Sequence, residues 1–117
     1  MLLGCSADEV IRVGNPFSNE GNEGVTFNNE ITDEEAINKL RTLIQNSQNT
    51  DKPNMENEAD AFFQLDRPNK NVSEVRRYIW FQDDGGAVLF DGGSNYSTLT
   101  KAQTLELKDI LELQFAP

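Results

Sequence analysis

Apolar residues recur at spacings of three and four between positions 36 and 44, which predicts an amphipathic helix. The apolar stripe is formed by Ala36, Ile37, Leu40, Leu43 and Ile44. Just before it, Thr32-Asp33-Glu34-Glu35 has the form of a capping box, with Thr32 as the N-cap and Glu35 as its reciprocal partner. We therefore expect a helix that begins after Thr32 and ends near Asn46.

A second helix is predicted near the C-terminus. Thr100-Lys101-Ala102-Gln103 is another capping box, with glutamine in the reciprocal role. The face that follows contains Gln103, Leu107, Ile110, Leu111 and Gln114. Leu105 lies to one side of it, so the apolar face is narrow and we expect this helix to pack at an edge of the domain.

Segments rich in β-branched and aromatic residues, separated by turn residues, predict an antiparallel sheet. Three of these segments should form a meander, and they are residues 59–66, 74–82 and 87–91. Shorter strands are expected at residues 8–13, 25–28 and 96–99. The turns between the meander strands carry typical turn residues, in Arg67-Pro68-Asn69-Lys70-Asn71 and in Asp83-Asp84-Gly85-Gly86.

Two segments are predicted to lack regular structure. Residues 14–24 are rich in glycine and asparagine and contain Pro16, which favours a loop. Residues 47–58 are almost entirely polar and contain Pro53, which favours a flexible connection. The fold class is therefore α+β, in a single domain spanning residues 8–117. It should have an antiparallel sheet, made of a three-stranded meander plus short N-terminal strands, with both helices on one face.

Aromatic residues occur on both faces of the predicted meander, because side chains alternate across a sheet. One face should carry Ala61, Phe63, Leu65, Val75, Ile79 and Phe81. The opposite face should carry Phe62, Tyr78 and Trp80, flanked by Arg76. If the helices cover the first face, the second either packs under the N-terminal strands or stays partly exposed. Exposure would suit a protein or glycan partner, so Phe62, Arg76, Tyr78 and Trp80 are the candidate binding residues.

Composition limits the possible partners and chemistry. The 117 residues carry 20 acidic and 10 basic side chains, a formal net charge of -10, which disfavours nucleic acid as a partner. There is no histidine and one cysteine, which removes Ser-His-Asp and Cys-His centres, histidine-based zinc sites and an internal disulfide. We expect a monomer with no catalytic residues, no metal and no cofactor.

An alternative from another class is a hydrolase that uses a carboxylate pair. The acidic clusters are Asp33-Glu34-Glu35, Glu56 with Glu58 and Asp60, and Asp83-Asp84. A helix cap, a solvated loop and a hairpin turn account for them in that order. A hydrolase would instead need two acids that converge in a concave pocket, with at least one partly buried.

The first residues resemble a bacterial lipobox. Leu2-Leu3-Gly4 is a short apolar run ending in a small residue, and Cys5 follows it before the chain turns polar. The resemblance implies that the Cys5 thiol accepts a diacylglyceryl group and becomes the mature N-terminus, so residues 1–7 are the end of a signal and its lipidation site. It also implies an extracytoplasmic domain held on the cell membrane by its lipid. The alternative is a cytosolic protein in which this run is a coincidence.

Three further stretches of the sequence carry a resemblance, and they are Phe62-Phe63-Gln64-Leu65-Asp66-Arg67-Pro68, Arg77-Tyr78-Ile79-Trp80-Phe81-Gln82-Asp83-Asp84-Gly85 and Leu99-Thr100-Lys101-Ala102-Gln103. Together they resemble the YhfM-like domain of small lipoproteins from bacilli. The likeness covers roughly residues 31–112 and implies a cell-surface lipoprotein, with no catalytic residues to carry over. We therefore expect a noncatalytic domain that binds or positions an envelope partner, a protein or a glycan, through its aromatic sheet face.

Overall fold

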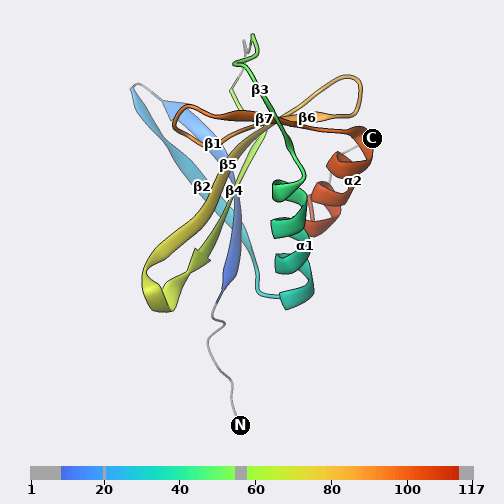
Figure 1. Ribbon diagram of the computed structural model, residues 1–117. Coiled ribbons are helices and arrows are strands. Elements are labelled where there is room, and N and C mark those ends of the chain that lie inside the picture. The colour runs from blue at the N-terminus through green and yellow to red at the C-terminus, as the bar shows by residue number, and fades with distance from the viewer. Residues whose placement is uncertain (1–8, 20, 55–57, 114–117) are drawn as a thin grey trace.

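The protein is an α+β domain with a seven-stranded antiparallel sheet and two helices (Figure 1). The computed structural model describes residues 9–19, 21–54 and 58–113. The elements in chain order are β1 (Val10–Asn19), β2 (Asn22–Ile31), α1 (Glu34–Gln45), β3 (Gln48–Thr50), β4 (Ala61–Arg67), a 3-10 turn η1 (Pro68–Lys70), β5 (Val72–Phe81), β6 (Ala87–Phe90), β7 (Tyr96–Leu99) and α2 (Lys101–Ile110). The strand order across the sheet is β2-β1-β4-β5-β6-β7-β3. The predicted meander is confirmed as β4-β5-β6, and the sheet has more strands than we expected.

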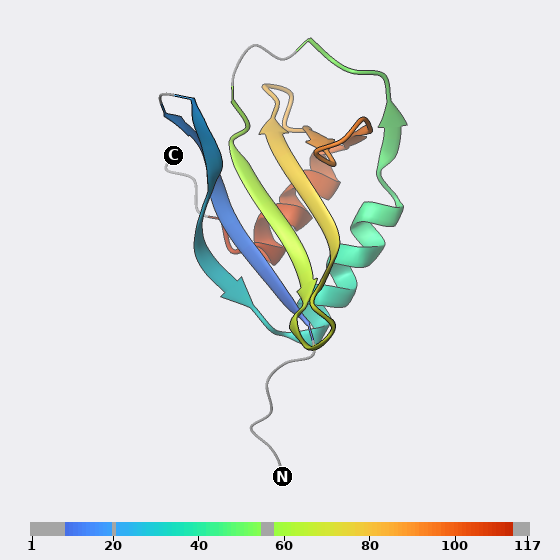
Figure 2. The same ribbon diagram turned by 90° about the vertical axis from the view of Figure 1, so that its left-hand side faces the viewer.

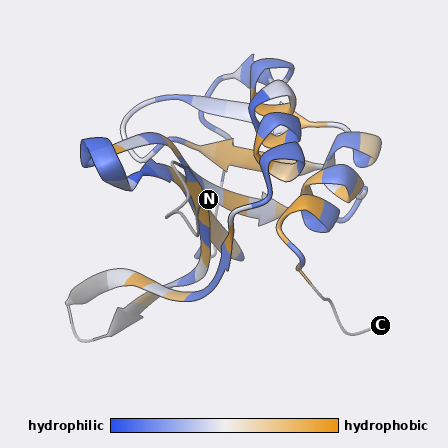
Figure 3. Cartoon of the chain, turned by 90° about the horizontal axis from the view of Figure 1, so that it is seen from below, coloured by the Kyte–Doolittle hydropathy of each residue, from blue (hydrophilic) through white to orange (hydrophobic). Residues whose placement is uncertain are grey.

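Both helices lie on one face of the sheet, as predicted (Figures 2 and 3). The main core lies between the helices and the sheet. The helices contribute Ile37, Leu40, Leu43, Leu107, Ile110 and Leu111 to this core. The sheet contributes Ile11, Val13, Ala61, Phe63, Leu65, Ile79 and Leu89 among others. The apolar centre of each predicted stripe is thus buried, while Leu105 stays 57% exposed. Gln114, the last residue of the second predicted stripe, lies outside the described residues.

The predicted N-cap of α1, Thr32, is wrong by one residue. The cap is Asp33, one residue later than Thr32, and its carboxylate accepts a hydrogen bond from the backbone N–H of Ala36 at 3.0 Å. Aspartate caps a helix at least as well as threonine, so moving the start by one residue costs little. The predicted capping box of α2 is confirmed, because Thr100 accepts from the N–H of Gln103 and the Gln103 side chain accepts from the N–H of Thr100.

The predicted loop at residues 14–24 is wrong, because β1 and β2 form a long hairpin paired from Ile11↔Ile31 to Asn19↔Asn22. Glycine, asparagine and proline have low strand propensity, but the ladder satisfies the backbone groups that a loop would leave to water. β1 pairs with β4 only as far as Gly14. Pro16 therefore lies where one side of β1 has no neighbouring strand, a position at which its missing N–H is tolerated.

The predicted connection at residues 47–58 also contains a short strand. β3 pairs with β7 through Gln48↔Thr98 and Thr50↔Tyr96 and forms one edge of the sheet. All three residues of β3 are exposed and polar, so the sequence has no apolar alternation from which a strand could be predicted. The predicted turn after β4 is present, and Asn71 closes it with a left-handed φ of 56°.

Candidate binding site on the open face of the sheet

The sheet face opposite the helices, called the open face below, carries one row of aromatic side chains. The strand register aligns Phe27, Gly14, Phe62, Tyr78, Phe90 and Tyr96, in that order, across β2, β1, β4, β5, β6 and β7. We call the five aromatic members the aromatic row. Because residues in register on adjacent strands point to the same side, antiparallel pairing alone brings these rings together.

Neighbouring rings of the aromatic row are in contact. The ring centroids lie 6.1 Å apart for Phe27 and Phe62, 4.9 Å for Phe62 and Tyr78, and 6.1 Å for Tyr78 and Phe90. Phe90 and Tyr96 stack at 4.4 Å. Aromatic pairs of this kind contribute about 0.5–1.5 kcal/mol each beyond the area they bury. The open face therefore has a packed aromatic layer of its own, separate from the core under the helices.

Gly14 makes the continuous row possible. It occupies the row position on β1, between Phe27 and Phe62, and has no side chain to separate them. A Cβ at Gly14 would lie 2.4 Å from the carbonyl oxygen of Thr26 and 2.9 Å from Cγ1 of Val25. The register of β1 against β2 also shifts between Val13 and Gly14. Glycine is therefore required where the hairpin bends and where Phe27 approaches Phe62.

A polar row borders the aromatic row toward the N-terminal end of β1. It consists of Glu30, Arg12, Gln64 and Arg76, which the register also aligns. Arg12 donates to Glu30 at 2.7 Å and to Asp66 at 3.0 Å, and Gln64 donates to Asp66 at 2.7 Å. These hydrogen bonds and ion pairs mark the boundary of the apolar part of the open face.

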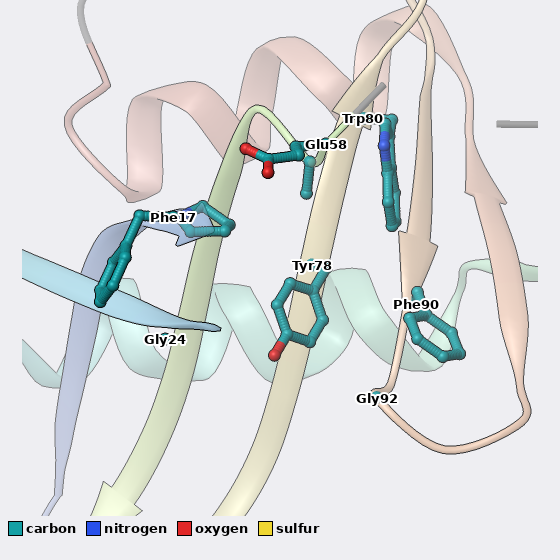
Figure 4. A pocket seen from close by; sticks show the side chains of 9 residues that line it. Phe17, Gly24, Glu58, Tyr78, Trp80, Phe90 and Gly92 are labelled. Atoms are coloured by element: carbon teal, nitrogen blue, oxygen red, sulfur yellow. The ribbon is translucent and has the colours of Figure 1, made fainter. Parts of the chain in front are cut away.

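A groove of about 400 Å³ opens at the other side of the aromatic row (Figure 4). Its lining residues are Pro16, Phe17, Gly24, Glu58, Ala59, Tyr78, Trp80, Phe90 and Gly92. Phe17 comes from the β1–β2 hairpin and lies across the groove from Trp80 and Phe90, with Tyr78 between them and Glu58 at one end (Figure 4). The groove thus combines four aromatic side chains with a single acid among the described residues that line it.

Two local structures hold the ends of the groove. Before β4, the Asp60 carboxylate accepts a hydrogen bond from the backbone N–H of Phe81 at 2.8 Å. The backbone carbonyl oxygen of Asp60 accepts from the Asn15 side chain at 3.1 Å. These bonds fix the segment that carries Glu58 and Ala59 against β5 and β1.

At the turn after β6, Asp91 accepts from the N–H of Gly93 at 2.8 Å and from the Asn95 side chain at 3.0 Å. These hydrogen bonds, that of Gly93 foremost, lower the pKa of Asp91 to about 2. The ionised Asp91 therefore fixes the turn in which Gly92 reaches the groove with a φ of 88°.

The sequence-predicted binding residues all lie on the open face, but they differ in their access to a ligand. Tyr78 and Trp80 line the groove. Phe62 is 0% exposed beneath its neighbours, so it supports the face and cannot contact a ligand directly. The guanidinium carbon of Arg76 lies 5.6 Å from the Phe62 ring centroid, outside the groove lining. Cys5, the predicted lipidation site, lies outside the described residues.

Sequence reasoning missed Phe17 and Phe90 as groove residues, and it named Glu58 only as a member of an acidic cluster. Phe17 was hidden because residues 14–24 were assigned to a loop. Phe90 could have been found, since extending the side-chain alternation of residues 87–91 places it on the same side as Tyr78. The acidic cluster that contains Glu58 was interpreted as a solvated loop, and only the fold brings Glu58 to the groove.

The described acids do not form a converging pair in the groove. Among the described residues, two carboxylates have shifted pKa values, Asp91 and Glu74, and the Arg41 hydrogen bond lowers the pKa of Glu74 to about 2. Glu74 lies six residues before Trp80 on β5, in ion pairs with Arg41 and Arg67. Within the described ranges, no group of three or more acid, cysteine or histidine side chains could hold a metal ion.

None of the helices in the described part of the chain is long and apolar enough to cross a membrane.

Comparisons with known proteins bear on the fold only. No protein-family model matches the sequence, and no curated protein matches it. A solved structure, described as a thioesterase-like protein from Clostridium sporogenes ATCC 15579, superposes with a TM-score of 0.60 over 86% of this chain and 91% of that chain. The two sequences are 19% identical. The chain therefore shares the α+β architecture of a thioesterase-like protein.

Proposed function

We propose that this protein is a noncatalytic binding domain that holds a ligand in the aromatic groove of its open face. The observation that carries the proposal is the groove itself, in which Phe17, Tyr78, Trp80 and Phe90 leave a concave, partly exposed aromatic surface. Aromatic side chains give large contact area at low entropic cost, and such residues dominate binding surfaces. A pocket of about 400 Å³ is within the usual size range for a ligand site.

We propose further that the domain is an extracytoplasmic lipoprotein anchored through Cys5, and that the groove faces a protein or glycan of the envelope. The lipobox-like run and the likeness to YhfM-like domains support the anchor. β1 begins at Val10, and Phe17 lies seven residues further, about 23 Å along a strand. An anchor before β1 would leave the groove at the end of the domain remote from the membrane. Intact mass of the protein from the native membrane fraction tests the lipid on Cys5.

The binding proposal is tested with Trp80, the one tryptophan of the chain, as an internal reporter. A panel of neutral oligosaccharides, aryl alcohols and alkylammonium compounds is titrated while the emission of Trp80 is recorded. We expect saturable changes with at least one class, weakened about tenfold by Tyr78→Leu and Phe90→Leu. Leu105→Ala on the exposed side of α2 serves as control. If the emission changes persist at the same ligand concentrations in both groove variants, the proposal is contradicted. It is also contradicted if no compound changes the emission.

A second candidate function is a hydrolase in which Glu58 acts as the base in the groove. It is favoured by the position of Glu58 at the groove and by the description of the structural neighbour as thioesterase-like. A panel of acyl thioesters and glycosides separates the two functions. Turnover that is abolished by Glu58→Gln supports the hydrolase, whereas binding without turnover supports the noncatalytic domain.

A further inference from the structure

The groove combines two chemical features that favour one class of ligand. Its walls are the rings of Phe17, Tyr78, Trp80 and Phe90 (Figure 4). An aromatic ring has a negative face, so a cation held within about 6 Å of the ring centroid is attracted to it. Several rings around one space make this attraction stronger than a single exposed ring can provide.

Charge complementarity points the same way. Glu58 is an exposed acid at one end of the groove, and no basic side chain occurs among the described residues that line it. The described arginines of the open face have partners outside the groove. Arg12 forms ion pairs with Glu30 and Asp66, and Arg76 lies over the Phe62 ring. The chain as a whole carries a formal charge of -10, which raises the local concentration of cations around it.

Resting on the proposed binding function, we propose that the groove binds an organic cation of the quaternary ammonium class. The aromatic walls contact the methyl groups of the cation, and the Glu58 carboxylate offsets its charge without a hydrogen bond. The groove volume of about 400 Å³ leaves room for a substituent that continues out of the groove. An inorganic cation is disfavoured, because it would lose its hydration shell to a wall that offers few oxygen ligands.

The test compares choline with 3,3-dimethyl-1-butanol, its neutral isostere, by isothermal titration and by the emission of Trp80. The two probes have the same shape, so a difference in affinity reports charge alone. We expect choline to bind at least tenfold more tightly than the isostere. Glu58→Gln should weaken the affinity for choline about fivefold or more and leave the affinity for the isostere unchanged. Glu106→Gln removes the same charge from α2, away from the groove, and should change choline affinity less than twofold.

The outcomes separate this inference from the function on which it rests. Equal binding of choline and its isostere overturns the cation selectivity while the binding function stands. Binding of a neutral oligosaccharide in preference to both probes has the same meaning. An equal effect of Glu106→Gln and Glu58→Gln shows that only the overall charge matters, which overturns the assigned role of the groove. Absence of binding by choline and by every compound of the wider panel overturns both proposals.

Discussion

Replacing Phe62 by alanine tests whether the open face has a packed layer that contributes to stability. Phe62 is 0% exposed, although it lies on the side of the sheet away from the helices. A buried phenylalanine removes about 150–250 Å² from water, which is worth about 4–6 kcal/mol at about 25 cal/mol per Å². Measured Phe→Ala substitutions in cores cost about 3–5 kcal/mol. We therefore expect Phe62→Ala to lower the free energy of unfolding by about 4 kcal/mol.

Phe27→Ala is the matched comparison, because Phe27 lies in the same row and contacts Phe62, but is 44% exposed. Roughly half of its area is buried, so we expect a loss of about 2 kcal/mol. The assay is urea unfolding followed by circular dichroism and by Trp80 emission. With a slope of about 1–3 kcal/mol per molar urea, the midpoint should fall by about 2 M for Phe62→Ala and by half as much for Phe27→Ala.

The Phe62→Ala variant can approach the limit of stability, since small domains have only about 5–15 kcal/mol in total. Phe62→Leu then provides the measurement, with an expected loss smaller than that of the alanine variant but larger than 1 kcal/mol. A Phe62→Ala cost no greater than that of Phe27→Ala would refute the claim that the open face contains a second packed layer.

Three further predictions concern the elements around the groove. Gly14→Val should lower the free energy of unfolding by at least about 1–3 kcal/mol through overpacking, because its Cβ would lie 2.4 Å from the carbonyl oxygen of Thr26. Urea unfolding measures this loss, and an unchanged stability would contradict the close approach. Thr100→Ala should cost about 1 kcal/mol in thermal unfolding by removing the cap of α2, and an unchanged melting temperature would show that the cap is dispensable. The hydrogen bond from Arg41 lowers the pKa of Glu74 from 4.5 to about 2, so folding favours the ionised carboxylate. The stabilisation that Glu74 provides is complete above about pH 5 and is lost as the pH falls toward 2. Glu74→Gln should therefore flatten the acid side of the stability profile, and a profile parallel to that of the unmodified protein would contradict this.

Periodicity predicted the elements that pack one face against the main core. Both helices, the β4-β5-β6 meander and the two faces of that meander follow from the alternation and spacing of apolar residues. Each of these elements directs one set of regularly spaced apolar side chains at the main core, so their sequences carry a clear period. Tyr78 and Trp80 were correctly placed away from the helices for the same reason.

The elements that were missed are stabilised by pairing and not by their own composition. The outer part of the β1–β2 hairpin contains Gly14 and Pro16, and β3 has three exposed residues, so neither shows a strand pattern. The backbone groups of the outer hairpin are satisfied by pairing between β1 and β2, and those of β3 by pairing with β7, which is distant in sequence. The groove could not be derived from the sequence because Phe17 reaches it only through this hairpin and Glu58 only through the contacts of Asp60.

The central claim is that the open face, and not the helical face, contains the ligand site. Chemical-shift mapping by two-dimensional NMR with choline as the probe tests it most directly. The account predicts saturable shifts concentrated on the Trp80 indole N–H and on the amides of Gly24 and Gly92, with α1 and α2 unaffected. Shifts concentrated on the helices, or none up to tens of millimolar choline, would contradict it.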